Sequence, residues 1–150
     1  MRYHECDAPR VVFNGHYGTY VDMAVTEFFN QLLPNRHDSD RPGSEAVEFQ
    51  LVRQVIEWKA PARFNDLIEI SAWCEKVGTT SFVMRFELRK ARPRQALETQ
   101  PFVTADTVSV VMNGNTWMKL PVPPDLRTKL LRGALGVVVD HAGHAQIDRA

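Results

Sequence analysis

The fold is decided by the stretch from His16 to Leu33, which reads HYGTYVDMAVTEFFNQLL. Its apolar side chains recur at spacings of three and four, the period of an α-helix with one buried face. Pro34 and the polar run after it end the predicted helix. Because the apolar stripe is broad, the helix needs a large surface to lie against. The members of the stripe are Tyr17, Tyr20, Val21, Ala24, Val25, Phe28, Phe29, Leu32 and Leu33.

Strands downstream of the helix supply that surface. From Glu45 to Lys59 apolar and polar residues alternate, and a change of phase near Leu51 and Val52 predicts one long strand with a bulge or bend. Residues 66–75 and 80–89 alternate on either side of a turn at Gly78. These two segments predict an antiparallel hairpin with one buried face.

Further strands follow the hairpin. Residues 102–112 predict one, and residues 116–119 predict a short last strand after the turn signal Asn113-Gly114. One long helix and an antiparallel sheet of about five strands indicate an α+β fold with the sheet curled around the helix. A long edge strand in such a sheet often pairs with a second copy, so we expect a homodimer.

The C-terminal part is less strongly patterned. Prolines at 121, 123 and 124 close the sheet region, and Asp125 to Arg132 predicts a short helix. We therefore expect one domain over residues 1–132 and a peripheral or flexible tail over residues 133–150.

Composition limits the setting. Lysine plus arginine and aspartate plus glutamate number 18 each, so no global field recruits nucleic acid or an anionic membrane. A signal-peptide pattern and an apolar run of transmembrane length are not found, and we expect a cytoplasmic protein. Cys6 and Cys74 lack metal-site spacing and are expected to be free thiols. His141 and His144 lack partners for a metal site, and we expect none.

An acid stands shortly before the helix. A helix N-terminus offers unpaired N–H groups and the positive end of the helix dipole, which stabilise a developing oxyanion. Asp7 is therefore a candidate nucleophile or general base, although the pattern fits an aspartate in a turn equally well. Asn14 fits an N-cap, and His16 fits a helix-start residue or a secondary candidate base.

Several motifs occur in one order along the chain. Asp7 is followed by Val11-Val12-Phe13-Asn14-Gly15-His16-Tyr17, and later come the segments 58–66, 77–82 and 119–123. Over roughly residues 2–130, they resemble the 4-hydroxybenzoyl-CoA thioesterase-like family of hotdog-fold acyl-CoA thioesterases. The resemblance implies a hotdog fold, dimers or dimers of dimers with active sites at the subunit interface, and an acyl-CoA substrate. It implies no cofactor, because coenzyme A is part of the substrate.

The resemblance also implies roles for single residues. Asp7 matches the catalytic carboxylate, acting as nucleophile or as base for water, and the backbone N–H of Asn14 matches the oxyanion donor. Tyr3 falls where relatives place an active-site tyrosine. Arg10 stands where many relatives have glycine; if the backbone there needs φ > 0, arginine costs about 1 kcal/mol or more and the loop would differ in shape.

Alternatives remain open at this point. The acyl donor is either coenzyme A or a carrier protein that docks at the basic cluster Arg89 to Arg94, or the protein is a non-catalytic hotdog that binds an acyl ligand. Trp58, Phe64, Trp73 and Phe82 are either an aromatic pocket or core. The basic candidates for binding the phosphates of coenzyme A are Lys59, Arg63, Lys76, Arg85, Arg89 and Lys90.

Overall fold

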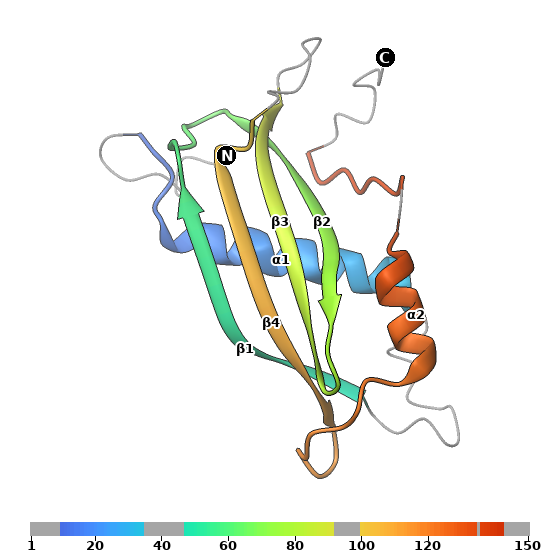
Figure 1. Ribbon diagram of the computed structural model, residues 1–150. Helices are drawn as coiled ribbons and strands as arrows, with labels where there is room; N and C mark the ends of the chain where they lie inside the picture. The colour runs from blue at the N-terminus through green and yellow to red at the C-terminus, as the bar shows by residue number, and fades with distance from the viewer. Residues whose placement is uncertain (1–9, 35–46, 92–99, 135, 143–150) are drawn as a thin grey trace.

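A computed structural model describes residues 10–34, 47–91, 100–134 and 136–142 of the chain (Figure 1). One antiparallel sheet has the strand order β1-β4-β3-β2, and helix α1 lies across one of its faces. The elements in chain order are α1 (Gly15–Leu32), β1 (Val47–Trp58), β2 (Leu67–Val77), β3 (Ser81–Ala91), β4 (Val103–Asn113) and α2 (Pro124–Arg132).

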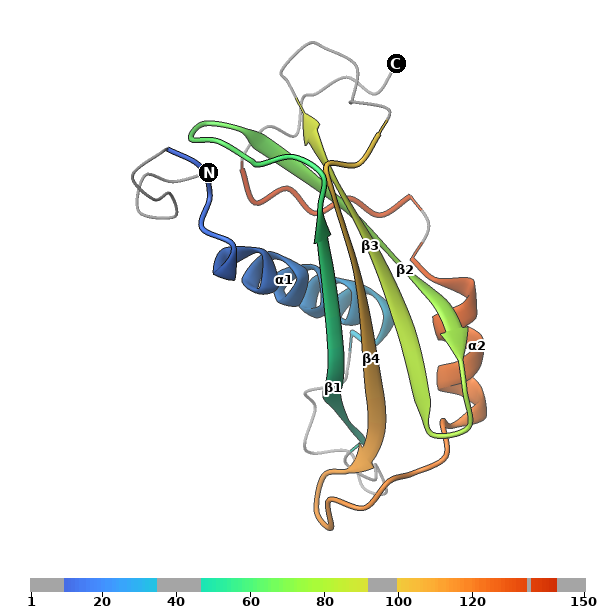
Figure 2. The ribbon, with the colours of Figure 1, turned by 60° about the vertical axis from the view of Figure 1, so that its left-hand side comes forward.

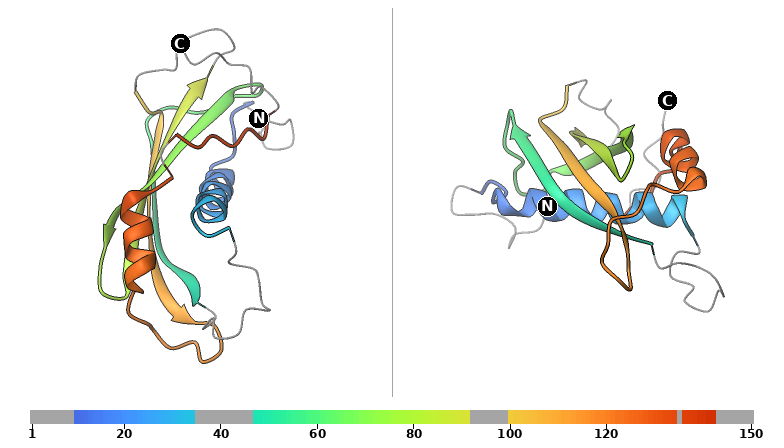
Figure 3. Two further views of the ribbon diagram at one scale, coloured as in Figure 1. Left: turned by 90° about the vertical axis from the view of Figure 1, so that its right-hand side faces the viewer. Right: turned by 60° about the horizontal axis from the view of Figure 1, so that its bottom comes forward.

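The predicted helix and its apolar stripe are confirmed. Tyr17, Val21, Phe28 and Phe29 are buried against the sheet, and the remaining members of the stripe pack around them. The sheet twists and bends over α1, as the side view in Figure 3 shows. Burying a side chain of this size stabilises the fold by roughly 1.5 to 3 kcal/mol, so the stripe is a main source of stability.

Strand alternation also matches the prediction. In β3, Phe82, Met84, Phe86 and Leu88 are buried while the residues between them are half exposed. β2 and β3 form the expected hairpin, with Leu67 opposite Ala91 at its open end. The bulge in β1 is confirmed as well, because the register with β4 shifts between Leu51 and Arg53.

A second bulge was not predicted. The register of β2 with β3 shifts between Cys74 and Lys76, and β2 continues to Val77, beyond the predicted end of the strand. The shift lies next to the hairpin turn, where an extra residue increases the local twist. Both bulges bend strands that lie at the edges of the described sheet, which Figure 2 shows curving around α1.

The sheet has four strands within the described residues, against about five predicted. The short last strand at residues 116–119 is reduced to a single bridge between Met112 and Lys119. The side-chain oxygen of Asn113 accepts the N–H groups of Asn115 and Thr116 at 2.9 and 3.0 Å. These hydrogen bonds close a compact turn where a longer run of strand pairing with β4 was predicted, and Trp117 adopts φ +58° within the turn.

Helix α2 is fixed to the β2–β3 hairpin by one side chain. Pro124 begins the helix, and Leu126 and Leu130 are buried beneath it. The guanidinium of Arg127 donates to the backbone oxygens of Val77 at 3.1 Å and Gly78 at 2.5 Å. The turn is thereby held against the helix that follows the sheet.

The described part of the tail returns to α1. After Gly133 the chain runs from α2 towards the side of α1 that faces away from the sheet (Figure 3). His141 Nε2 lies 3.3 Å from Glu27 Oε1, and Val137, Val138 and Val139 are exposed. Residues 133–142, except 135, therefore follow a defined path, while the domain boundary predicted at residue 132 stays a prediction.

Replacing Arg127 with methionine tests the clamp between α2 and the hairpin. Methionine keeps much of the apolar stem but leaves the oxygens of Val77 and Gly78 without the guanidinium, so we expect the free energy of unfolding to fall by about 1 to 3 kcal/mol. Urea denaturation measures it. Arg132→Met, on the exposed last turn of the same helix, is the control and should cost less than about 0.5 kcal/mol. Equal effects of the two substitutions would contradict the clamp.

Candidate active site

The segment before α1 is held by the loop that follows β1. Val11 and Arg63 form an antiparallel bridge. On either side of it, the N–H of Val12 donates to the oxygen of Ala62 at 2.9 Å, and the N–H of Phe64 donates to the oxygen of Arg10 at 3.3 Å. The approach to the helix is thus a short stretch of paired backbone in a fixed position.

Tyr17 adds a side-chain connection between the same two segments. Its hydroxyl accepts the backbone N–H of Ala62 at 3.0 Å in a buried environment. The tyrosine ring meets the Trp58 ring edge-on, with 6.0 Å between centroids. Core packing was the role predicted for Tyr17, and this hydroxyl contact is additional to it.

The first turn of α1 leaves backbone donors available. The N–H of His16 donates to the oxygen of Phe13 at 3.0 Å, and the N–H of Tyr17 donates to the oxygen of Asn14 at 3.3 Å. Asn14 is the N-cap by position, with helical φ and ψ and no side-chain capping bond. The N–H groups of Asn14 and Gly15 have no acceptor among the residues that the structure describes. Two donors at a helix start suit an anionic oxygen.

His16 lies beside these donors. It is half-buried, and its ring meets the Phe13 ring edge-on with 6.1 Å between centroids. The exposed Phe13 ring also covers Gly15, since a Cβ atom at Gly15 would lie 2.8 Å from Phe13 Cε1. Glycine at 15 therefore allows an aromatic side chain to lie over the start of the helix.

Arg10 adopts the left-handed conformation, with φ +62°. This is the backbone that glycine favours, so the loop keeps the positive φ and arginine carries the strain, which is about 1 kcal/mol. The expected alternative, a loop of different shape, is not needed. The hydrogen bond from Phe64 to the Arg10 oxygen and the bridge at Val11 hold the strained residue in place.

The predicted site residues divide into two groups. Asn14 and His16 lie together at the start of α1, and His16 directly precedes Tyr17, whose hydroxyl bonds Ala62. Tyr3 and Asp7 lie outside the described residues, so their roles stay predictions. The Tyr17 hydroxyl was not singled out from sequence, although a tyrosine on a buried helical stripe signals a need for a hydrogen-bond partner.

Most of the basic candidates are engaged on the sheet. Arg85 bonds Asp106 at 2.9 Å and Glu75 at 2.8 Å, and the hydrogen bond to Asp106 raises the pKa of Arg85. Arg89 pairs with Glu87, and Lys90 lies 3.5 Å from Asp66. Lys59, Arg63 and Lys76 form no ion pair with another described residue. Lys76 lies near the end of β2, whereas Lys59 and Arg63 belong to the loop beside the helix start.

The aromatic candidates divide between the core and the surface near the helix start. Phe82 is core, packed against Phe29 and Phe49. Trp58 and Phe64 are 45% and 41% exposed, and both lie near the loop that holds the helix start. Of the two cysteines, Cys74 is a free thiol whose pKa is raised by burial, and Cys6 lies outside the described residues.

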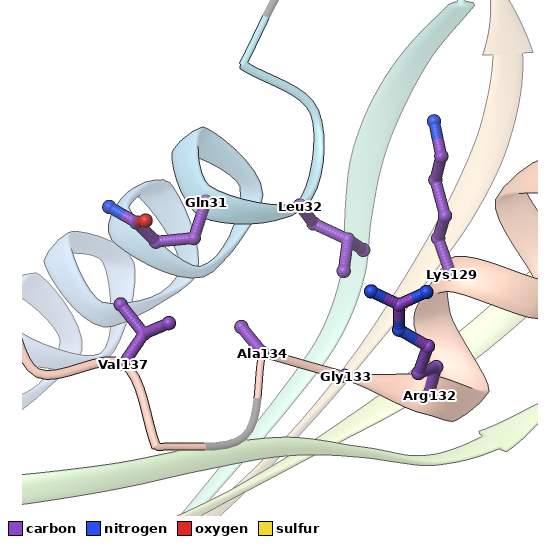
Figure 4. A pocket seen from close by; sticks show the side chains of 7 residues that line it. All are labelled: Gln31, Leu32, Lys129, Arg132, Gly133, Ala134 and Val137. Atoms are coloured by element: carbon purple, nitrogen blue, oxygen red, sulfur yellow. The ribbon is translucent and has the colours of Figure 1, made fainter.

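A cavity of about 380 Å³ lies at the other end of α1 (Figure 4). Leu32 and Val137 form part of its apolar wall, and Lys129 and Arg132 extend towards it. It adjoins the C-terminal turns of α1 and α2 and so does not coincide with the donors of Asn14 and Gly15.

In the described residues, the fold and the helix start define a class of protein: one antiparallel sheet curled around a long helix whose first turn has N–H groups without a described acceptor. The chain belongs to the Thioesterase superfamily, whose sequence model matches residues 10–97. The resemblance inferred from the motifs is thereby confirmed. No described helix is long and apolar enough to cross a membrane.

Individual relatives agree with this family. The acyl-CoA thioester hydrolase YbgC of Escherichia coli O157:H7 is 32% identical over 82 residues, which cover 54% of this chain and 58% of the relative. The chain thus aligns with little more than half the length of the curated relatives that it matches.

Solved structures share the hotdog fold. A gentisyl-coenzyme A thioesterase has a TM-score of 0.69 at 21% identity, covering 87% of this chain and 94% of that chain. A variant 4-hydroxybenzoyl-CoA thioesterase with bound 4-hydroxybenzoyl-CoA has a TM-score of 0.73 at 19% identity, covering 87% and 93%. The predicted hotdog architecture is confirmed.

Substitutions at Arg10 test the left-handed turn. Arg10→Gly removes the strain but adds unfolded-state entropy, so the free energy of unfolding should stay within about 1 kcal/mol of the wild type. Arg10→Val places a β-branched residue at φ +62° and should lower it by more than about 1 kcal/mol. Chemical denaturation distinguishes the two. A valine variant as stable as the glycine variant would show that residue 10 is not held at positive φ.

Proposed function

We propose that this protein is an acyl-CoA thioesterase that hydrolyses a thioester to a free carboxylic acid and coenzyme A. The observation that carries the proposal is the pair of N–H donors at Asn14 and Gly15, without an acceptor among the described residues, in a member of the Thioesterase superfamily. An Escherichia coli relative named acyl-CoA thioester hydrolase supports the substrate class.

The proposed chemistry combines these donors with the carboxylate of Asp7. Asp7 either attacks the thioester carbonyl carbon itself or removes a proton from the water that attacks. The carbonyl oxygen becomes an oxyanion that accepts the N–H of Asn14; loss of one such donor in an enzyme costs roughly 3 to 4 kcal/mol. The carbon–sulfur bond then breaks, and coenzyme A leaves as a thiolate that takes up a proton. Where Asp7 is the nucleophile, water next hydrolyses the mixed anhydride between Asp7 and the acyl group, which releases the acid and regenerates the carboxylate; where Asp7 is the base, the attacking water itself supplies the oxygen of the acid. Tyr3, the Asn14 side chain and His16 are candidates for orienting the acyl group or the water.

The ion pairs of the basic residues indicate which cationic side chains are available to bind the phosphates of coenzyme A. Arg85, Arg89 and Lys90 are already paired with carboxylates. Lys59 and Arg63 have no such partner among the described residues and flank Ala62, the residue bonded to the helix start. We therefore assign the coenzyme A phosphates to these two cations, with Trp58 and Phe64 as the nearest aromatic surface.

The active unit in this proposal is a homodimer, or a dimer of such dimers. β1 is an edge of the described sheet, and its bulge presents Leu51 and Val52, which are 46% and 57% exposed. An apolar edge strand of this length is suited to pairing with a second copy. Such pairing would place the end of β1, beside the helix start, at the subunit boundary.

A charged residue at the bulge tests the dimer. Val52→Glu should leave the monomer folded and weaken self-association, because two carboxylates would meet at an edge-to-edge contact. Sedimentation velocity over a range of concentrations measures the association state. Val138→Glu, an equally exposed valine in the C-terminal segment, is the control and should associate as the wild type does. Unchanged association of Val52→Glu would contradict pairing through β1.

Replacing Asp7 with asparagine tests the activity and its key residue together. The amide can neither attack the thioester nor accept a proton from water, so we expect kcat to fall by at least about 100-fold. Release of free thiol from a panel of acyl-CoA esters and acyl carrier proteins measures turnover and donor class. Asp22→Asn, an exposed aspartate on α1, should retain wild-type turnover.

Other results of that screen would replace the proposal. Near-wild-type turnover by Asp7→Asn would remove the carboxylate assignment, and turnover of carrier-protein esters alone would change the donor. Ligand binding without turnover would make the protein a non-catalytic acyl binder. Arginine in place of the family's usual glycine at position 10 is the sequence feature that most favours that alternative, and the left-handed conformation of Arg10, the one glycine favours, weakens it.

A further inference from the structure

Both backbone groups of Ala62 are used to hold the start of α1. Its oxygen accepts the N–H of Val12 at 2.9 Å, and its N–H donates to the Tyr17 hydroxyl at 3.0 Å. The backbone N–H of Tyr17 in turn donates to the oxygen of Asn14 at 3.3 Å. These three hydrogen bonds form a closed circuit through Val12, Ala62, Tyr17 and Asn14.

The circuit is shielded from water. Ala62, Tyr17 and Val12 are 0%, 1% and 2% exposed. A hydrogen bond in such surroundings is electrostatically stronger than one in water, and its loss leaves a buried donor without a partner. The Tyr17 ring also meets the Trp58 and Tyr20 rings edge-on, with centroids 6.0 and 5.8 Å away. These aromatic contacts hold the ring that carries the hydroxyl.

Packing alone does not require this hydroxyl. Phenylalanine would fill the same place on the apolar stripe, as Phe28 and Phe29 do about three turns further along α1. A buried hydroxyl costs free energy unless it is hydrogen-bonded, and here it accepts the Ala62 N–H. The contact joins the helix to the residue that anchors the preceding loop, so it fixes where the first turn lies.

We propose that Tyr17 is a positioning residue for thioester hydrolysis: its hydroxyl holds the Ala62 peptide and thereby sets the direction of the Asn14 and Gly15 N–H groups. The inference rests on the proposed function. Asn14 lies inside the circuit, between Val12 and Tyr17, so a shift of the Ala62 peptide moves the oxyanion donor. Small displacements of catalytic groups reduce rates strongly, because the transition state needs its donors in place.

Tyr17→Phe is the direct test. It keeps the ring and removes the hydroxyl, and we expect kcat to fall by about tenfold with KM changed by less than about twofold, since the donor acts on the developing oxyanion more than on bound substrate. Amide hydrogen exchange at Ala62 should speed up in the same variant. Leu130→Val, a buried change in α2, matches the loss of thermal stability and should leave kcat and the Ala62 exchange rate unchanged.

A second variant covers the case in which Tyr17→Phe does not fold. Ala62→Gly keeps both backbone groups but loosens the peptide, and it should lower kcat more than Leu130→Val does at equal thermal stability. Equal kcat in wild type and Tyr17→Phe, with turnover that still needs Asp7, overturns the positioning role alone. A wild type without thioesterase activity overturns the proposed function instead. A parallel fall of kcat in Leu130→Val would reduce Tyr17 to a general stability effect.

Discussion

The structure depends on burying the broad apolar stripe of α1. A helix with so many large apolar side chains on one side needs a concave partner, and the sheet provides it by twisting and by bulging in β1 and in β2. Both bulged strands are edges of the described sheet, where an extra residue is tolerated because one side has no ladder to disrupt. The same bend leaves apolar residues of β1 exposed. The bulge that lets the sheet cover α1 therefore also creates an apolar surface suited to a second copy.

This burial also explains why the helix start can remain incompletely capped. Asn14 makes no side-chain capping bond, a loss that costs a helix about 1 kcal/mol. The packed body of α1 and the circuit through Ala62 compensate for that loss. N–H groups at the first turn that have no acceptor among the described residues are therefore maintained by contacts elsewhere in the helix. The packed middle of α1 supplies the stability that its first turn lacks.

The regular spacing of apolar residues was enough to predict α1, the β2–β3 hairpin and the bulge at Val52. Burial on one face directly determines which positions of a helix or strand are apolar. The bulge beyond Cys74 and the turn closed by Asn113 escaped prediction, since each depends on local hydrogen bonds that leave the apolar pattern unchanged. In the candidate site, sequence predicted Asn14 and His16 at the helix start. The contact between Tyr17 and Ala62 joins residues 45 positions apart, and no local signal encodes such a pairing.

Arg10 shows how strain and function are linked in this loop. Glycine would adopt φ +62° freely, yet it would also allow the segment many other conformations before folding. Arginine accepts a strain of about 1 kcal/mol and narrows those conformations, while the bond from Phe64 to the Arg10 oxygen and the bond from Val12 to the Ala62 oxygen hold the backbone at Arg10 and after it. Because these hydrogen bonds over-determine the conformation, the strain is retained directly before the first turn of α1.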